Sequence, residues 1–105
     1  MHQFVAYKNQ NASTSKQYPY LLDIQNDLLA ELRSTVVIPL SPSDLVAGFR
    51  LSKLNRVVLI EGESYTPMTQ DMAGITRRQL GSDGVDLAHF RSDILAAIDF
   101  LISGI

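Results

Sequence analysis

The C-terminal stretch, residues 86–105, carries the longest helical periodicity in the chain. Its apolar side chains recur every three or four positions, which places them on one stripe of an α-helix. They are Leu87, Phe90, Ile94, Leu95, Ile98, Leu101 and Ile102. Asp86 is a candidate N-cap, and Gly104 stands where helices commonly end. We expect residues 86–102 to be structural, with the stripe packed on the rest of the domain.

The end of this helix has an unfavourable charge. Residues 96–105 contain Asp99 but no Lys or Arg. An acidic group near the negative end of a helix dipole costs a few tenths of a kcal/mol to about 1 kcal/mol. The tip is therefore either frayed or available to a basic partner.

Alternating apolar and polar positions near the N-terminus predict a β-hairpin. Residues 2–8 and 18–25 alternate in this way, which is typical of strands that bury one face. In the first strand, Phe4 and Ala6 share a face. The small and polar residues 9–16 between the strands predict an exposed loop.

The middle of the chain predicts further short strands. Residues 35–40 and 56–60 are continuous apolar runs, which favour buried strands. Pro39 and Pro42 are expected to end the first of them. The other expected elements are a helical turn within 26–32, a short helix opening at 42–45, a turn at 61–63, a strand at 64–68, an extended segment at 68–73, an edge strand at 75–80 and a connection at 81–84.

The predicted elements describe one domain, residues 1–105, of six or seven short strands followed by one helix. The order has no strand–helix–strand rhythm, so the sheet is expected to be mostly antiparallel. The expected fold class is therefore mainly β with a C-terminal α-helix. A small, partly open SH3-like barrel with the helix laid on it is the simplest architecture.

Composition narrows the classes of function. The chain has 105 residues, 19% of them charged, and a formal net charge of −2. A nucleic-acid-binding protein of this size is usually basic. The sequence has no cysteine, no apolar run long enough for a transmembrane span and no signal-peptide layout at its start. We expect a cytoplasmic protein with no membrane partner.

The sequence offers little support for catalysis. The two histidines, His2 and His89, lack metal-ligand spacing and a recognisable nucleophile motif. The acidic residues are scattered over predicted turns, and no Gly-rich phosphate loop is present. We therefore expect no catalytic residue, metal or cofactor. The basic doublet Arg77 and Arg78 is interpreted as protection of an edge strand, with contact to RNA phosphate as the alternative.

Six short segments occur in the order and spacing of a known family. They are Gln3-Phe4 with Tyr7-Lys8, DIQNDLL at 23–29, VIPL at 37–40, MTQDMA at 68–73, DLAH at 86–89, and the ending from Ala97-Ile98 to Gly104-Ile105. With these segments the chain resembles the CcdB toxins. No single segment is specific, but together they span nearly the whole chain.

The resemblance implies a toxin of a type II toxin–antitoxin system with no enzymatic activity. CcdB toxins are homodimers that bind the A subunit of DNA gyrase. They trap the complex of gyrase with cleaved DNA, which blocks replication and transcription. A CcdA-like antitoxin neutralises the toxin, and the two together repress their operon. Operator DNA is thus expected as a partner only through the antitoxin complex.

The resemblance also implies a gyrase-binding surface. Carried over by position, it consists of Ser103, Gly104, Ile105, Asp99, Asn26, Leu28 and Leu29. Two positions depart from the well-studied member of this family, which has Trp in place of Ser103 and Asn in place of Asp99. Since Trp is a typical hot-spot residue, its absence weakens one expected anchor. Our hypothesis is that charge replaces stacking, with Asp99 and the Ile105 carboxylate pairing with an arginine on gyrase.

Two other functions remain open at this point. Endoribonuclease toxins of the MazF/Kid type share the expected fold and need a basic groove, which Arg33, Arg77 and Arg78 would have to supply. A homologue that binds antitoxin but no longer poisons gyrase is the third possibility. For the dimer interface, one candidate is an apolar patch formed by Val36, Ile38 and Met68.

Overall fold

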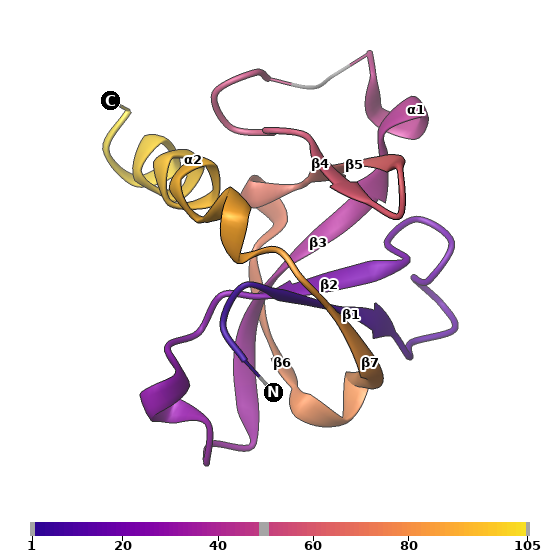
Figure 1. Ribbon diagram of the computed structural model, residues 1–105, viewed down its shortest axis with the longest axis vertical. Coiled ribbons are helices and arrows are strands. Elements are labelled where there is room, and N and C mark those ends of the chain that lie inside the picture. The colour runs from indigo at the N-terminus through magenta and orange to yellow at the C-terminus, as the bar shows by residue number, and fades with distance from the viewer. Residues whose placement is uncertain (1, 49–50, 105) are drawn as a thin grey trace.

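The computed structural model describes residues 2–48 and 51–104 as a curled antiparallel sheet with a C-terminal helix (Figure 1). The strands are β1 (Val5–Asn9), β2 (Tyr20–Asp23), β3 (Ser34–Pro42), β4 (Val58–Ile60), β5 (Glu63–Pro67), β6 (Ala73–Thr76) and β7 (Leu80–Asp86). The helices are α1 (Ser43–Val46) and α2 (Arg91–Ser103). Short 3₁₀ turns occur at Asp27–Leu29, Thr69–Asp71, Arg77–Gln79 and Ala88–Phe90. The fold class expected from the sequence is confirmed.

The sheet curls because β3 changes partners along its length. The strand order is β4-β5-β3-β2-β1-β7, and β6 also pairs with β3. The first half of β3 lies against β6, with Val37 opposite Ala73, and its second half lies against β5, with Leu40 opposite Pro67. All pairs are antiparallel. The result is the partly open barrel that the order of the predicted strands and helix favoured.

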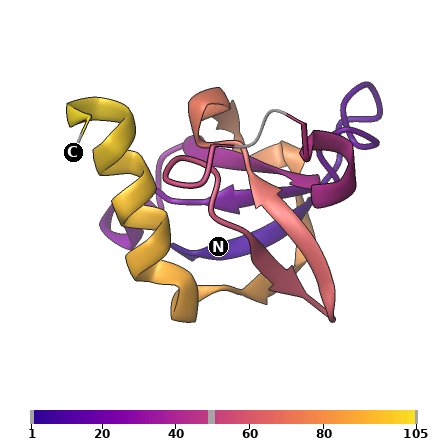
Figure 2. The ribbon, with the colours of Figure 1, turned by 90° about the horizontal axis from the view of Figure 1, so that it is seen from above.

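Both faces of the hairpin strands pack apolar side chains. The main core lies inside the curl and is closed by α2, which contributes the buried Ile94 (Figure 2). Leu22 of β2 points into this core, whereas its neighbour Leu21 joins a second cluster on the other face. Tyr7 of β1 belongs to that second cluster and Ala6 to the first. The predicted alternation of these strands is therefore confirmed.

Residues 81–84 were expected to be a connection, and this expectation was wrong. They belong to β7, which pairs with β1 so that Tyr7 lies opposite Gly84. A Cβ atom at Gly84 would lie 2.8 Å from Cε1 of Tyr7 and would also overlap Cγ1 of Val5. The glycine therefore permits close approach of two strands, although its surrounding composition is that of a turn.

Three further expectations about extended structure need correction. Pro39 does not end β3; it lies inside the strand opposite Leu21, and its carbonyl oxygen accepts a hydrogen bond of 2.8 Å from the Met68 backbone nitrogen. The chain at Thr69–Asp71 forms a 3₁₀ turn, where an extended segment was expected. Arg77–Gln79 is also a 3₁₀ turn and not part of an edge strand.

The C-terminal helix ends at Gly104 as predicted, but it differs from its prediction in its start and in the packing of its apolar stripe. It begins at Arg91, because Asp86 still belongs to β7 and its carboxylate accepts a hydrogen bond of 2.8 Å from the Ala88 backbone nitrogen. The apolar stripe is only partly packed, since Leu101 is 39% and Ile102 77% exposed. In Figures 1 and 2 the C-terminal part of α2 extends past the rest of the chain.

Two of the three residues suggested as a dimer interface are buried, and the third, Val36, is half-buried. Ile38 is fully buried in the main core, and Met68 is 7% exposed. These side chains stabilise the single chain and cannot face a second copy. Within residues 2–48 and 51–104, no helix is both long and apolar enough to cross a membrane.

Candidate protein-binding site

The tip of α2 is an ordered helix end. The helix runs through Ser103, and Gly104 adopts the left-handed conformation (φ 74°) that suits a C-cap glycine. The Gly104 backbone nitrogen donates a hydrogen bond of 2.9 Å to the carbonyl oxygen of Phe100. Ser103 and Asp99 are both exposed. Ile105, the last residue of the proposed surface, lies outside the described residues.

Asp99 lines a shallow groove of about 270 Å³ that also contains Lys53, Arg56 and Phe100. Arg56 is already paired, with Nη1 at 3.0 Å from Oδ1 of Asp93. Lys53 places its Nζ 5.8 Å from the centre of the Phe100 ring. Among the described residues, Asp99 forms no ion pair. Its carboxylate therefore remains available to a cation from outside the chain.

The apolar part of the tip was missed by the sequence interpretation. Leu101 and Ile102 were placed in a packed stripe, but they stand in solvent beside Ser103. Helical periodicity identifies such residues as one face and does not say what covers that face. A helix end with exposed Leu and Ile side chains has the character of a protein-binding surface.

The second part of the proposed surface is the 3₁₀ turn Asp27–Leu29. Asn26 caps it, because its Oδ1 accepts a hydrogen bond of 2.8 Å from the Leu28 backbone nitrogen. Leu28 is 89% exposed and Leu29 45%. The short helical turn and the exposure of both leucines, which a buried core does not explain, are therefore present in the structure.

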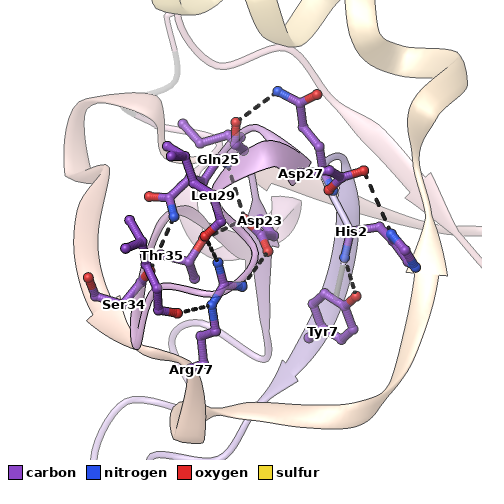
Figure 3. A network of polar contacts seen from close by, with 12 residues as sticks. His2, Tyr7, Asp23, Gln25, Asp27, Leu29, Ser34, Thr35 and Arg77 are labelled. Carbon is purple, nitrogen blue, oxygen red and sulfur yellow. Dashed lines mark hydrogen bonds and ion pairs between the residues drawn. The ribbon is translucent and has the colours of Figure 1, made fainter.

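The N-terminal segment ties this turn to the sheet. Oδ1 of Asp27 accepts a hydrogen bond of 2.8 Å from the Gln3 backbone nitrogen, and its Oδ2 lies 3.7 Å from Nδ1 of His2. The Gln3 side chain donates to the carbonyl oxygen of Ile24 at 3.1 Å. Figure 3 shows Asp27 and His2 side by side in this network. The Gln3 and Asp27 positions of the family segments thus make contact across the fold.

A buried acid lies behind the turn. Asp23 is 2% exposed, and its Oδ1 accepts hydrogen bonds from Thr35 Oγ1 at 2.7 Å and from the Gln25 backbone nitrogen at 3.1 Å. Nη1 of Arg77 lies 3.6 Å from its Oδ2 (Figure 3). The interpretation of Arg77 as protection of an edge strand was therefore wrong, because its side chain points inward. Arg78 is the exposed member of the doublet.

The structure does not join the two parts of the proposed surface within one chain. In Figure 1 the α2 tip and the turn Asp27–Leu29 lie on the same side of the molecule, the tip toward the top and the turn toward the bottom. No hydrogen bond or ion pair between described residues links them. A partner that touches both must therefore be large, or must meet them on two copies of the chain.

The residues required by a ribonuclease do come together. Arg33, Arg77 and Arg78 line one open hollow of about 450 Å³, together with Thr76. Arg77 is neutralised there by Asp23, so the free charge belongs to the other two arginines. The described residues contain no group of three His, Cys, Asp or Glu side chains arranged to hold a metal ion.

The sequence was compared with models of known protein families, and one family matches it. The family described as CcdB protein matches residues 3–104, which is nearly the whole sequence. The match includes both strands of the N-terminal hairpin, the exposed turn and the whole of α2. It is consistent with the curled half-barrel and the C-terminal helix. The chain therefore belongs to the CcdB family and is a toxin of a toxin–antitoxin system.

Proposed function

We propose that this toxin is a homodimer that binds the A subunit of DNA gyrase and traps the enzyme on cleaved DNA. The observation that carries the proposal is the unpacked tip of α2, where Ile102 is 77% exposed beside Ser103 and Asp99. Membership of the CcdB family supports gyrase as the target. Replication and transcription then stall at the trapped complexes.

Burial of the exposed leucines and isoleucine supplies the affinity. Covering a fully exposed Leu or Ile side chain contributes about 1.5–3 kcal/mol. Leu28 and Ile102 are the most exposed large apolar side chains among the described residues. Leaving them in water has no benefit for the isolated chain, whose core is already closed by Ile94. Contact with a protein partner gives them a role.

A twofold dimer accounts for the separation of the two surface parts. In such a dimer each residue of the surface occurs twice around one axis, and gyrase is itself a twofold enzyme. The α2 tips of the two protomers then present one symmetric surface to the A subunits. The turn Asp27–Leu29 forms the rim of this surface.

Charge complements the apolar contacts. Asp99 has no ion-pair partner among the described residues, and its carboxylate can accept a bidentate pair from an arginine of gyrase. This pairing replaces the aromatic stacking that Ser103 cannot supply.

The remaining partners follow from the same family. A CcdA-like antitoxin binds the toxin, removes it from gyrase and with it represses the operon. Operator DNA is contacted through the antitoxin, in agreement with the net charge of −2 on the toxin. The toxin acts in the cytoplasm, where gyrase and antitoxin are found, and without enzymatic activity of its own.

An endoribonuclease is the second candidate, supported by the hollow that Arg33, Thr76 and Arg78 share. Family membership favours gyrase, and the inward orientation of Arg77 removes one of the three required cations. The third candidate, a homologue that retains antitoxin binding alone, rests on the absence of Trp at Ser103.

One assay separates the three candidates. Purified chain is incubated with gyrase and plasmid, and separately with RNA alone. Linear plasmid released by denaturation of gyrase supports the proposal. RNA cleaved in the absence of gyrase supports the ribonuclease. Neither product, together with tight binding of antitoxin, supports the third candidate.

A further inference from the structure

The loop that displays Leu28 lies outside the sheet and has few contacts of its own. It leaves β2 after Asp23 and returns to β3 at Ser34. Each of its internal backbone hydrogen bonds closes only a single turn. One example is the bond of 3.1 Å from the Leu32 nitrogen to the carbonyl oxygen of Leu29. No side chain of Asp27–Leu29 is buried. An isolated loop of this kind does not hold one conformation, so its order requires an external contact.

Gln3 holds one end of the loop through Asp27, and Arg77 supplies contacts to the rest of it from a distant part of the chain. Its Nε donates a hydrogen bond of 2.6 Å to the carbonyl oxygen of Leu32, and its Nη2 donates one of 3.1 Å to the carbonyl oxygen of Leu29. The Arg77 backbone nitrogen donates to the carbonyl oxygen of Arg33 at 2.9 Å. Three carbonyl groups of the loop are therefore held by one residue. Figure 3 shows the guanidinium group of Arg77 between Asp23 and Leu29.

Asp23 fixes the guanidinium group in turn. Its carboxylate is buried and is held by Thr35 and by the Gln25 backbone nitrogen. Nη1 of Arg77 lies 3.6 Å from its Oδ2, and the Arg77 side chain is only 17% exposed. The hydrogen bonds to the Asp23 carboxylate fix its position, and the carboxylate in turn fixes the guanidinium group of Arg77. The guanidinium group then fixes the loop through its hydrogen bonds to the carbonyl oxygens.

We infer that Arg77 is a positioning residue of the gyrase-binding surface. It holds the segment 27–33 in the conformation that projects Leu28 into solvent. Binding therefore costs less conformational entropy, because the loop is already ordered. The inference rests on the proposed function, in which Leu28 and Leu29 touch gyrase. It also extends the surface to a residue that the family segments do not include.

The geometry requires arginine at this position. Its planar group donates hydrogen bonds to two carbonyl oxygens through Nε and Nη2, while Nη1 lies within ion-pair distance of the Asp23 carboxylate. Lysine carries the same charge on a single ammonium group and cannot span the three acceptors. Arg77→Lys therefore keeps the ion pair with Asp23 but loses the hydrogen bonds that hold the loop. This variant distinguishes the effect of the positive charge from the effect of the hydrogen-bond geometry.

The test uses the full-length toxin and two measurements. The first is hydrogen exchange of the Leu29, Ala30 and Leu32 amides in the free protein, whose bonds define the turn. The second is affinity for the gyrase A subunit. The variants are Arg77→Lys and Arg77→Met, with Arg78→Met as the matched control, since it removes the same charge from the adjacent exposed position.

We expect Arg77→Met to speed exchange at the three loop amides by about tenfold or more, while core amides such as that of Ile38 are unchanged. Gyrase affinity falls by about tenfold, and Arg77→Lys does not rescue it. In a Leu28→Ser background the Arg77→Met change has little further effect on affinity, because both act through the same contact. Arg78→Met leaves loop exchange and affinity within about twofold of the parent.

Unchanged exchange at the three amides in Arg77→Met overturns the inference, as do additive effects of Leu28→Ser and Arg77→Met on affinity. Should Arg77→Met fail to fold because Asp23 is left unpaired, the double variant Asp23→Asn with Arg77→Met removes both charges and is measured in its place. If the parent toxin does not bind gyrase, the proposed function fails, and loop exchange alone still decides whether Arg77 positions the turn.

Discussion

The hydroxyl group of Ser103 donates a hydrogen bond of 2.7 Å to the carbonyl oxygen of Asp99, one turn earlier in α2. This bond satisfies the hydroxyl within the helix, so Ser103 has no polar group left to offer as a donor. The small serine side chain also leaves the surface above the last turn open, where the well-studied family member has the large ring of a Trp. The contacts available there are the side chains of Leu101 and Ile102 and the carboxylate of Asp99.

Replacement of Ser103 by Trp should therefore strengthen the toxin. A large aromatic ring at an exposed interface position adds apolar contact and is the commonest kind of hot spot. We expect the concentration of Ser103→Trp that yields half-maximal linear plasmid to be about tenfold lower than for the parent. Ser103→Ala, which only removes the bond to Asp99, should match the parent. A weaker Ser103→Trp toxin would show that this position does not meet gyrase.

Extension of the C-terminus by one residue, or its amidation, should abolish toxicity without unfolding the protein. Both changes displace or remove the Ile105 carboxylate, which we propose to pair with an arginine of gyrase. Asp99→Asn should weaken binding and reduce its dependence on salt, because a charge pair is screened by ions. Growth of cells expressing each variant gives the readout. Killing by a C-terminally extended toxin would refute the charge hypothesis.

Leu28→Ser should lower gyrase affinity by about tenfold, while the free energy of unfolding changes by less than about 0.5 kcal/mol. The reason is its 89% exposure, which leaves no packing to lose. Leu45→Ser is the matched control, since Leu45 is also exposed, at 56%, but lies in α1. Titration of the A subunit and urea unfolding provide the two measurements. Equal effects of both variants on affinity would count against a role for the turn.

Gly84→Ala should destabilise the fold by about 1–3 kcal/mol, as overpacked positions do. The added Cβ atom meets the side chains of Val5 and Tyr7 between β7 and β1. Gly74→Ala in β6 is the control, because a Cβ atom there has nothing within 4 Å. Urea unfolding compares the two. A stable Gly84→Ala protein would mean that β7 does not approach β1 so closely.

Alkaline pH should weaken the fold partly through Tyr18. Burial, followed by the negative charge of Asp71 and the hydrogen bond of 3.1 Å that the phenol donates to it, raises the pKa of Tyr18 above 10.0. Above about pH 10 the unfolded chain loses this proton before the native chain does, so stability falls as pH rises through the native pKa. Tyr18→Phe should reduce that fall. A spectroscopic titration in which Asp71→Asn leaves the pKa of Tyr18 unchanged would contradict the contribution of Asp71 to the raised pKa.

The sequence allowed prediction of those features that depend on neighbouring residues. Alternation in β1 and β2 identified the two faces that carry Leu21 and Leu22. The helical turn expected within 26–32 is present at Asp27–Leu29, and the family resemblance placed Leu28 and Leu29 on the expected partner surface. Gly104 identified the end of α2. Each of these signals lies within a few residues of the feature it predicts.

Features that depend on distant contacts were not predictable in the same way. Gly84 has turn-like neighbours, and its role in β7 appears only when Tyr7 is placed opposite. Arg77 carries no local sign that its guanidinium group meets the carbonyl oxygens of Leu29 and Leu32. The periodicity that includes Ile102 describes an amphipathic helix whether its face meets the same chain or another protein.

Gyrase-dependent cleavage of plasmid DNA tests most directly whether this toxin traps gyrase on cleaved DNA. Purified toxin is titrated into gyrase and supercoiled plasmid, and gyrase is then denatured to release any cleaved DNA. We expect the amount of linear plasmid to increase with the concentration of the parent toxin and to be lower for Leu28→Ser and for the C-terminally extended chain. Gyrase is not the target if the parent toxin, folded and at saturating concentration, yields no linear plasmid while a known gyrase poison does so in the same reaction.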